Sequence, residues 1–303
     1  MYSTTTWNDL PTEMKMTIVN LLESEDVKSE RLIVSIAASL PVLEELTLDR
    51  ISRSILHASE LVGAYPYIPI VTGDHDIVNH PNLGSDLSLP SLLRIPSLRK
   101  LVIRETHLGD PKWLTVPAAC RLEELDLGSC PHETEDANSL FIERIMSTIG
   151  PSVNKASLST AIADESFSQP SATPLKRLRK LHISPFFPVD SVVDTMSNLS
   201  GSPIESVSVR CFEDDVIDVC SAVEEFLNIR VERGPSFYRN LARVQVNVAH
   251  SNLGAGTPKD EPQRARAARR LQELCMDLQL ESVCAPIIYL FLRSVRKIPA
   301  VNY

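Results

Sequence analysis

Side chains that could hold a metal ion gather in one short stretch of the sequence, TGDHDIVNH at residues 72–80. Its carboxylate and imidazole groups belong to Asp74, His75, Asp76 and His80. Both kinds of group bind divalent metal ions. Residues so close together in a loop seldom converge on one ion, however, and Gly-Asp and Asn-His-Pro are common in turns. We therefore expect no metal site and no cofactor, and a metal-dependent enzyme built on this loop is the weakest of three readings of the sequence.

Other catalytic patterns are missing from the sequence. It contains no glycine-rich phosphate-binding loop followed by a helix and no G-x-S-x-G turn that would present a serine nucleophile. Its six cysteines are scattered without a C-x-x-C pair. This spacing favours buried, reduced thiols in an intracellular protein over a zinc site or a disulfide framework. We therefore expect a protein that is not an enzyme and acts by binding.

Composition and net charge restrict the classes of molecule that are expected as the main binding partner. Apolar residues make up 43% of the chain and charged residues 23%, as in ordinary folded proteins. The formal net charge of −9 argues against nucleic acid or an anionic membrane as the main partner, because both are anionic. No uncharged apolar run reaches the roughly 18 residues that a membrane span needs, and the first residues do not resemble a secretory signal. We expect a cytoplasmic or nuclear protein that binds other proteins.

One short motif recurs along the chain: apolar, polar, polar, apolar, polar, apolar. The clear copies are LEELTLD (43–49), LRKLVIR (98–104), LEELDLG (122–128) and LRKLHIS (178–184), and two looser ones are IESVSVR (204–210) and LARVQVN (241–247). The alternating second half of each copy predicts a short strand with one face buried and the other in solvent.

The spacing of these copies predicts a repeat architecture. Leu101 and Leu125 are separated by a period in the mid-twenties, and the separations from Leu46 to Leu101 and from Leu125 to Leu181 are close to two such periods. The doubled gaps predict further strands near 67–71 and 156–159. The motif and period resemble the leucine-rich repeat family, in which each unit is a short strand plus a helix. The Asn or Cys that usually closes the family's motif is missing, so the repeats are irregular.

We therefore expect an α/β solenoid in which short parallel strands alternate with helices. Helical periodicity predicts the intervening helices near 138–149, 190–196 and 214–227. The irregular leucine-rich repeats are expected at 40–250. A linker and a C-terminal helical cap are expected at 251–303, where RARAARR (264–270) opens a helix.

The solvent-facing positions of the predicted strands are candidates for binding a target protein, since successive strands would present them as one continuous surface. These positions are Glu45, Thr47, Lys100, Val102, Glu124, Asp126, Lys180 and His182. The set mixes both signs of charge, which favours a polar protein partner.

The segment from Trp7 to Val27 has a different pattern from the repeats. Its apolar residues Leu10, Met14, Ile18, Leu21 and Leu22 form a single stripe at helical spacing. Pro11 suits a first helical turn, and Ser24 suits the cap of a second helix. The segment therefore predicts a helix, a tight turn and the start of another helix.

These residues resemble the front half of an F-box. Leu10-Pro11-x-Glu13, then Ile18, Leu22 and Asp26-Val27 follow that family's register without a gap. The second half matches poorly, because Glu30 replaces an apolar residue and Ile36-Ala37 stand where a basic residue and a tryptophan are usual. We therefore expect an F-box-like helical segment at 1–39, ahead of the repeats.

The resemblance implies docking onto the adaptor subunit of a cullin-type (SCF) ubiquitin ligase. The implied adaptor-binding residues are Leu10, Pro11, Glu13, Met14, Ile18, Leu21, Leu22 and Val27.

The main reading is therefore a substrate receptor of an SCF ubiquitin ligase, with the adaptor on the F-box-like helices and an unidentified target protein on the repeats. An alternative is that Trp7–Val27 is only the N-terminal cap of a solenoid. The protein would then be a leucine-rich-repeat interaction scaffold with no role in a ligase. The third reading is the metal-dependent enzyme on the 72–80 loop.

Overall fold

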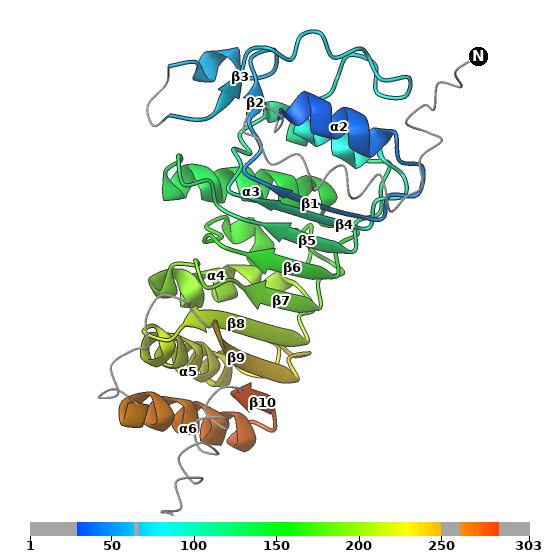
Figure 1. Ribbon diagram of the computed structural model, residues 1–303. Coiled ribbons are helices and arrows are strands. Elements are labelled where there is room, and N and C mark those ends of the chain that lie inside the picture. Colours follow the sequence, from blue (N-terminus) through cyan, green and yellow to red (C-terminus); the bar gives the residue numbers. More distant parts are fainter. Residues whose placement is uncertain (1–28, 64–66, 250–260, 285–303) are drawn as a thin grey trace, which may run out of the picture. The chain divides into compact units, whose positions relative to one another are not determined.

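The structure is a computed structural model that describes residues 29–63, 67–249 and 261–284 (Figure 1). The F-box-like residues Leu10 to Val27 lie outside the described residues, so the predictions made for them stay predictions. The chain divides into two compact units, Met1–Ile149 and Gly150–Tyr303, and each is considered by itself. Both units are α/β, with parallel strands alternating with helices, as expected.

The first unit contains three parallel strands in the order β1-β4-β5, and a separate short parallel pair, β2-β3 (Figure 1). Its elements are α2 (Glu30–Ala38), β1 (Glu45–Asp49), β2 (Arg53–Ser54), η3 (Ser59–Leu61), β3 (Ile70–Val71), η4 (Leu89–Arg94), β4 (Lys100–Arg104), η5 (Pro111–Leu114), β5 (Glu124–Leu127) and α3 (Glu135–Ile149).

The second unit contains five parallel strands in the order β6-β7-β8-β9-β10. Its elements are β6 (Lys155–Leu158), η6 (Glu165–Ser168), β7 (Lys180–Ile183), η7 (Val189–Ser191), α4 (Val192–Asn198), η8 (Leu199–Gly201), β8 (Ser206–Phe212), α5 (Val216–Arg233), β9 (Arg243–Ala249), α6 (Glu261–Asp277) and β10 (Glu281–Cys284).

All six copies of the motif form strands, which confirms the prediction from their alternation. One of the two strands predicted in the doubled gaps is also present, as β6. The other prediction is wrong in part: residues 70–71 form β3, but β3 pairs with β2, and β1 pairs directly with β4. The segment between β1 and β4 therefore leaves the β1-β4-β5 row and forms the separate β2-β3 pair, and we call it the β2-β3 excursion.

The first half of the motif joins neighbouring strands through backbone hydrogen bonds. The carbonyl oxygen of Glu44 accepts from the N–H groups of both Arg99 and Lys100, at 2.7 and 2.9 Å. The carbonyl oxygen of Arg99 accepts in the same way from Glu123 and Glu124, at 2.7 and 3.1 Å. In the second unit the carbonyl oxygens of Asn154, Arg179 and Glu205 repeat the arrangement. The two polar positions of the motif therefore supply the donors that dock each strand on the strand before it.

The apolar positions of the motif build the core. Leu98 and Leu122, the first residues of two copies, are fully buried, and Leu101 and Leu125 are at most 2% exposed. Burial of each leucine side chain contributes roughly 1.5–3 kcal/mol, so the repeated leucines are a main source of stability.

The helices predicted near 138–149, 190–196 and 214–227 are present as α3, α4 and α5. The helix opened by RARAARR is α6, and two of its arginines bind acids of the region that it packs on: Arg264 contacts Glu213 and Arg270 contacts Glu224. The sequence did not predict β10, which follows α6. No helix within the described ranges is long and apolar enough to cross a bilayer.

Glycine is required at Gly201 by the closeness of a neighbouring segment. A Cβ atom there would overlap the carbonyl oxygen of Phe167 and would lie 2.9 Å from the carbonyl carbons of Ser168 and Gln169. We expect Gly201→Ala to lower the free energy of unfolding by about 1–3 kcal/mol, as measured by urea denaturation. Gly73→Ala is the matched control, because a methyl group at that position would have no other atom within 4 Å. Equal stability of the two variants would contradict this packing.

Candidate functional site

The outward positions of the first unit lie in two rows across β1, β4 and β5. Glu45 is opposite Lys100, which is opposite Glu124. Thr47, Val102 and Asp126 form the second row in the same way. The expected alignment of these positions on neighbouring strands is therefore confirmed.

Charges in these rows are matched to one another. The Lys100 Nζ atom lies 3.4 Å from Glu45 Oε2 and 3.8 Å from Glu124 Oε1. Arg104, at the end of β4, donates to Asp126 at 2.6 Å. These contacts are at least partly exposed and each contributes little to stability, but acid opposite base favours the observed register. The first unit thus presents a face whose charges are already paired.

One predicted target-binding residue is not available on this face. Val102 lies in the outward phase of β4, yet only 4% of its surface is exposed. Its short side chain lies between Lys100 and Arg104 on its own strand and between Thr47 and Asp126 on the neighbouring strands. Alternation predicts the direction of a side chain but not the size of the neighbours that cover it, so the prediction that Val102 faces solvent was wrong.

The two predicted residues of the second unit are both accessible. Lys180 is exposed and His182 is half-buried, and they lie opposite Ser206 and Ser208 of β8. Arg210 and Phe212, which follow on the same face of β8, were not among the predicted residues. Their alternation with the buried residues 209 and 211 was the signal that could have identified them.

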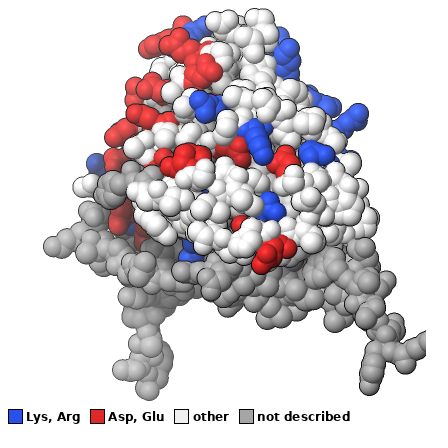
Figure 2. Space-filling model, turned by 90° about the horizontal axis from the view of Figure 1, so that it is seen from above, with Lys and Arg blue, Asp and Glu red and all other residues white. Residues whose placement is uncertain are grey.

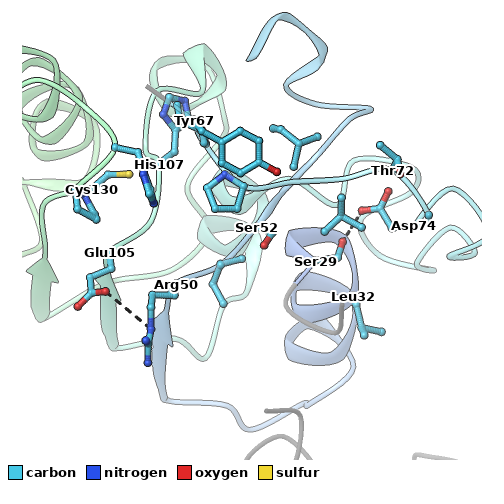
Figure 3. A pocket seen from close by; sticks show the side chains of 18 of the residues that line it. Ser29, Leu32, Arg50, Ser52, Tyr67, Thr72, Asp74, Glu105, His107 and Cys130 are labelled. Carbon is cyan, nitrogen blue, oxygen red and sulfur yellow. Dashed lines mark hydrogen bonds and ion pairs between the residues drawn. The ribbon is translucent and has the colours of Figure 1, made fainter. Parts of the chain in front are cut away.

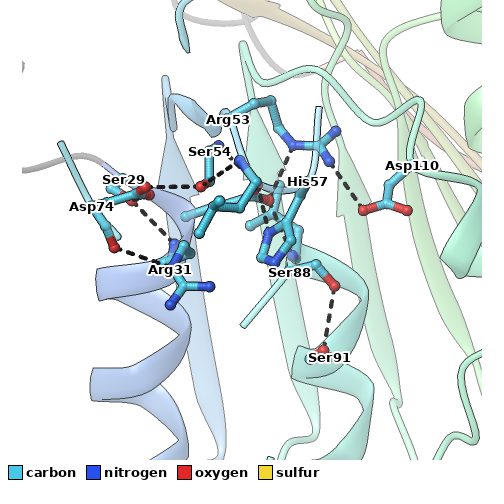
Figure 4. A network of polar contacts seen from close by, with 12 residues as sticks. Ser29, Arg31, Arg53, Ser54, His57, Asp74, Ser88, Ser91 and Asp110 are labelled. Carbon is cyan, nitrogen blue, oxygen red and sulfur yellow. Dashed lines mark hydrogen bonds and ion pairs between the residues drawn. The ribbon is translucent and has the colours of Figure 1, made fainter. Parts of the chain in front are cut away.

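A buried network of charged groups joins the start of α2 to the rest of the first unit (Figure 4). At its centre Arg53 is only 1% exposed, with Nε 3.0 Å from Glu30 Oε2 and Nη2 3.0 Å from Asp110 Oδ2. The Glu30 side chain is fully buried. One guanidinium therefore binds two carboxylates that come from distant parts of the sequence.

The Glu30 carboxylate has further partners. Its Oε1 atom accepts from the backbone N–H of Ser54 at 2.9 Å and lies 3.0 Å from His57 Nδ1. Burial by itself raises the pKa of Glu30, but the hydrogen bond from His57 and the charge of Arg53 outweigh it, so the pKa is held below its ordinary value of 4.5. Glu30 is therefore a buried, charged and fully hydrogen-bonded group at the first turn of α2.

The same network fixes the residue just before α2. The Ser29 hydroxyl donates to Asp74, and Asp74 also accepts from the Ser54 hydroxyl at 2.9 Å. Arg31 donates to the carbonyl oxygens of Asp74 and Ile77, at 3.2 and 3.0 Å. The loop that the sequence singled out as a metal candidate is thus bound to the helix start through Asp74.

The other metal candidates do not converge with Asp74. Asp74 is 4% exposed, whereas the side chains of His75 and Asp76 are 65% and 91% exposed. His80 is buried, and its Nδ1 accepts from the backbone N–H of Asn82 at 3.2 Å. Within the described ranges of the chain no three His, Cys, Asp or Glu side chains are grouped so that they could hold a metal ion.

An open cavity of about 970 Å³ lies beside this network in the first unit (Figure 3). Asp74 and Ser29 line one part of it, and Glu105, His107 and Cys130 line another. Burial raises the pKa of the Cys130 thiol, which keeps it protonated and a poor nucleophile. The cavity therefore offers hydrogen bonds and apolar contact, without an activated thiol.

Two residues at the cavity edge have an unusual backbone. Arg50 and Glu105 follow β1 and β4 with φ values of 53° and 47°, in the left-handed region that few residues other than glycine adopt. Arg50 donates its backbone N–H to the carbonyl oxygen of Arg104 at 3.0 Å. The side chains of Arg50 and Glu105 meet at 3.9 Å (Figure 3). The left-handed backbone at Arg50 and Glu105 turns the chain out of each strand.

The charged surface is mixed in sign. Figure 2, which views the molecule from above, shows acidic side chains gathered along one side of the face, basic side chains mainly along the other, and both signs scattered among uncharged residues between them. Comparison of the chain with protein-family models, with curated proteins and with solved structures gave no match.

We expect Arg53→Ala to lower the free energy of unfolding by about 3–5 kcal/mol, because it leaves two buried carboxylates without a counter-charge. Arg50→Ala is the matched control: its side chain is 64% exposed and its ion pairs are 3.7 and 3.9 Å long, so its loss should change stability by less than about 1 kcal/mol. Urea denaturation of both variants measures the difference. A small effect at Arg53 would show that the network contributes little.

We expect the free energy of unfolding to fall as the pH is lowered from about 6.5 to 4. Burial and the charge of Arg53 lower the pKa of His107 to about 4. In this pH range the unfolded chain binds a proton that the folded chain does not, so acid favours unfolding. At pH 5 the loss from this residue is about 2 kcal/mol. His107→Gln should remove that part of the pH dependence in urea denaturation at pH 7 and pH 5, and an unchanged slope would contradict the assignment.

Proposed function

We propose that this protein is the substrate-recognition subunit of an SCF-type ubiquitin ligase and that it has no catalytic activity of its own. In this proposal the F-box-like residues at 10–27 bind the adaptor subunit, and the outward faces of the parallel strands bind the target protein. The observation that carries the second half is the strand register: recurring motif copies place their polar side chains in rows on neighbouring strands.

The attachment of α2 supports the first half. A substrate receptor must hold its target at a set distance from the ligase, which requires a stiff connection between the two binding regions. Ser29 is 3% exposed, hydrogen-bonded to Asp74, and followed directly by the buried Glu30. The first described residues after the F-box-like stretch are therefore fixed to the first unit by buried hydrogen bonds.

The departure of the sequence from the F-box pattern also has a structural explanation. Glu30 stands where the family has an apolar residue, and it is the carboxylate that holds Arg53, Ser54 and His57. These contacts hold the α2 helix on the first unit. In our proposal the adaptor is therefore bound by the F-box-like residues at 10–27, and α2 belongs to the first unit.

A repeat scaffold without a ligase connection is the alternative. It shares the strand faces with the proposal and differs only in the role of residues 10–27. A metal-dependent enzyme is less well supported, because Asp74 is used by the buried network and its neighbours His75 and Asp76 are exposed.

The test is binding of the adaptor subunit to the purified full-length chain. We expect the intact protein to retain the adaptor in a pull-down, and Leu10→Asp combined with Ile18→Asp to lower binding at least tenfold, since about 1.4 kcal/mol is lost for each factor of ten. The control is Thr12→Asp combined with Asn20→Asp, which adds the same charges away from the apolar stripe. If the intact protein does not bind, or if both double variants behave alike, the ligase role fails and the scaffold reading replaces it.

A further inference from the structure

The second unit has an open strand face that differs from the paired face of the first unit. We call it the β7–β9 face and define it by the outward residues of these strands and the aromatic residue beside them: Lys180, His182, Phe186, Ser206, Ser208, Arg210, Phe212 and Gln245. Leu181, Val207 and Val244, which alternate with them, are at most 2% exposed, so the two sides of these strands are clearly separated.

Two cations on this face are not matched by acids. Arginines nearby have their own partners: Arg179 binds Glu205, Arg243 binds Glu281 with Nε 2.9 Å from the carboxylate, and Arg264 binds Glu213. Lys180 and Arg210 are both exposed and have no ion pair with any other residue of the described ranges. The β7–β9 face therefore carries an excess of positive charge in a chain whose net charge is −9.

An exposed aromatic pair lies at the other end of the same face. Phe186 is 74% exposed, which is unusual for a phenylalanine side chain. Its ring packs edge-to-face on Phe212, with centroids 5.4 Å apart and an interplanar angle of 72°. An apolar surface of this kind beside polar residues is typical of a binding site.

The strand geometry sets the spacing between these groups. Ser206 lies opposite Lys180 and so marks the level of Lys180 on β8. Arg210 lies four residues after Ser206 on the same side of β8, and Phe212 lies two residues after Arg210. At about 3.3 Å per residue, the Lys180 level is roughly 13 Å from Arg210, and Phe212 is about 7 Å further on. An extended peptide has the same rise, so its side chains four and then two positions apart would meet these three levels.

We propose that the β7–β9 face binds an extended acidic segment of the target protein. Two carboxylates of that segment lie at Lys180 and Arg210, and an apolar side chain packs on Phe186 and Phe212. Ser208 and Gln245, between the two cations, provide hydrogen-bonding groups for its backbone. This inference rests on the target-binding half of the proposed function and names the chemistry of the target.

Charge complementarity favours a target over the chain's own C-terminal residues. Residues 285–303 contain Arg293, Arg296 and Lys297 and no aspartate or glutamate. A cationic segment does not suit a face whose unmatched groups are Lys180 and Arg210.

The test uses the full chain and synthetic fluorescein-labelled peptides in anisotropy titrations. The probe peptide carries two glutamates four positions apart and a phenylalanine two positions after the second, in a Ser-Gly background, and is made in both sequence directions. The comparison peptide has glutamine in place of both glutamates. We expect the glutamate peptide in one direction to bind at least tenfold more tightly, and its affinity to fall as salt is raised.

Variants locate the binding. Lys180→Glu combined with Arg210→Glu should weaken binding of the glutamate peptide at least tenfold, and Phe186→Ala should weaken it about fivefold. Arg266→Glu combined with Arg269→Glu is the matched control, because both arginines are exposed on α6, away from the strand positions that define the face. Circular dichroism and thermal unfolding establish that all variants are folded.

Three outcomes would overturn the inference: equal binding of the glutamate and glutamine peptides, unchanged binding by the Lys180/Arg210 variant, or an equal loss in the α6 control. Tighter binding of a single-stranded oligonucleotide that depends on Lys180 and Arg210 would also overturn it and assign the face to nucleic acid instead. Because the adaptor test changes residues at positions 10 to 20 and the peptide test changes none of them, failure of the ligase role leaves peptide binding intact, and the two results are distinguishable.

Discussion

The first unit depends on one buried interaction, the binding of the Arg53 guanidinium by Glu30 and Asp110. Charges taken out of water are costly unless each is paired and hydrogen-bonded. Here Glu30 also accepts from Ser54 and His57, and Asp110 accepts from the backbone N–H of Lys112 at 2.9 Å. The free-energy cost of burying these charged groups is therefore offset only when α2, the β2-β3 excursion and the loop before η5 are all in place. Directional hydrogen bonds and ion pairs of this kind fix the position of α2 more specifically than apolar contacts alone.

Local periodicity allowed the strands to be predicted. The motif places its apolar residues at fixed spacing, and six copies, including the loose ones at 204–210 and 241–247, became strands. The β2-β3 excursion could not be predicted in the same way, because β3 has only two residues and its partner precedes it in an irregular segment. The direct pairing of β1 with β4 depends on how neighbouring repeats stack. The doubled spacing between their motif copies wrongly predicted a further strand between them.

The buried network was missed for a different reason. Glu30, Arg53 and Asp110 are far apart in the sequence, and nothing local brings them together. One signal was present: the F-box resemblance predicts an apolar residue at position 30, and a charged side chain that is buried instead requires a partner. Among the candidate binding residues, the register rows were predictable from alternation, but the burial of Val102 and the exposure of Phe186 depend on the sizes of neighbours contributed by other strands.

The shared carbonyl acceptors of the motif have a consequence for how such a surface can change. Since Glu44, Arg99 and Glu205 join adjacent strands with main-chain atoms alone, the identity of the side chains at those places is not needed for the strands to stack. Replacement of an acidic by a basic side chain at the outward strand positions therefore leaves the backbone bonds between the strands unchanged. The charge pattern of the outward strand positions can therefore change one residue at a time, whereas an insertion between the paired donors of a motif copy would disturb the bonds that join its strand to the preceding one.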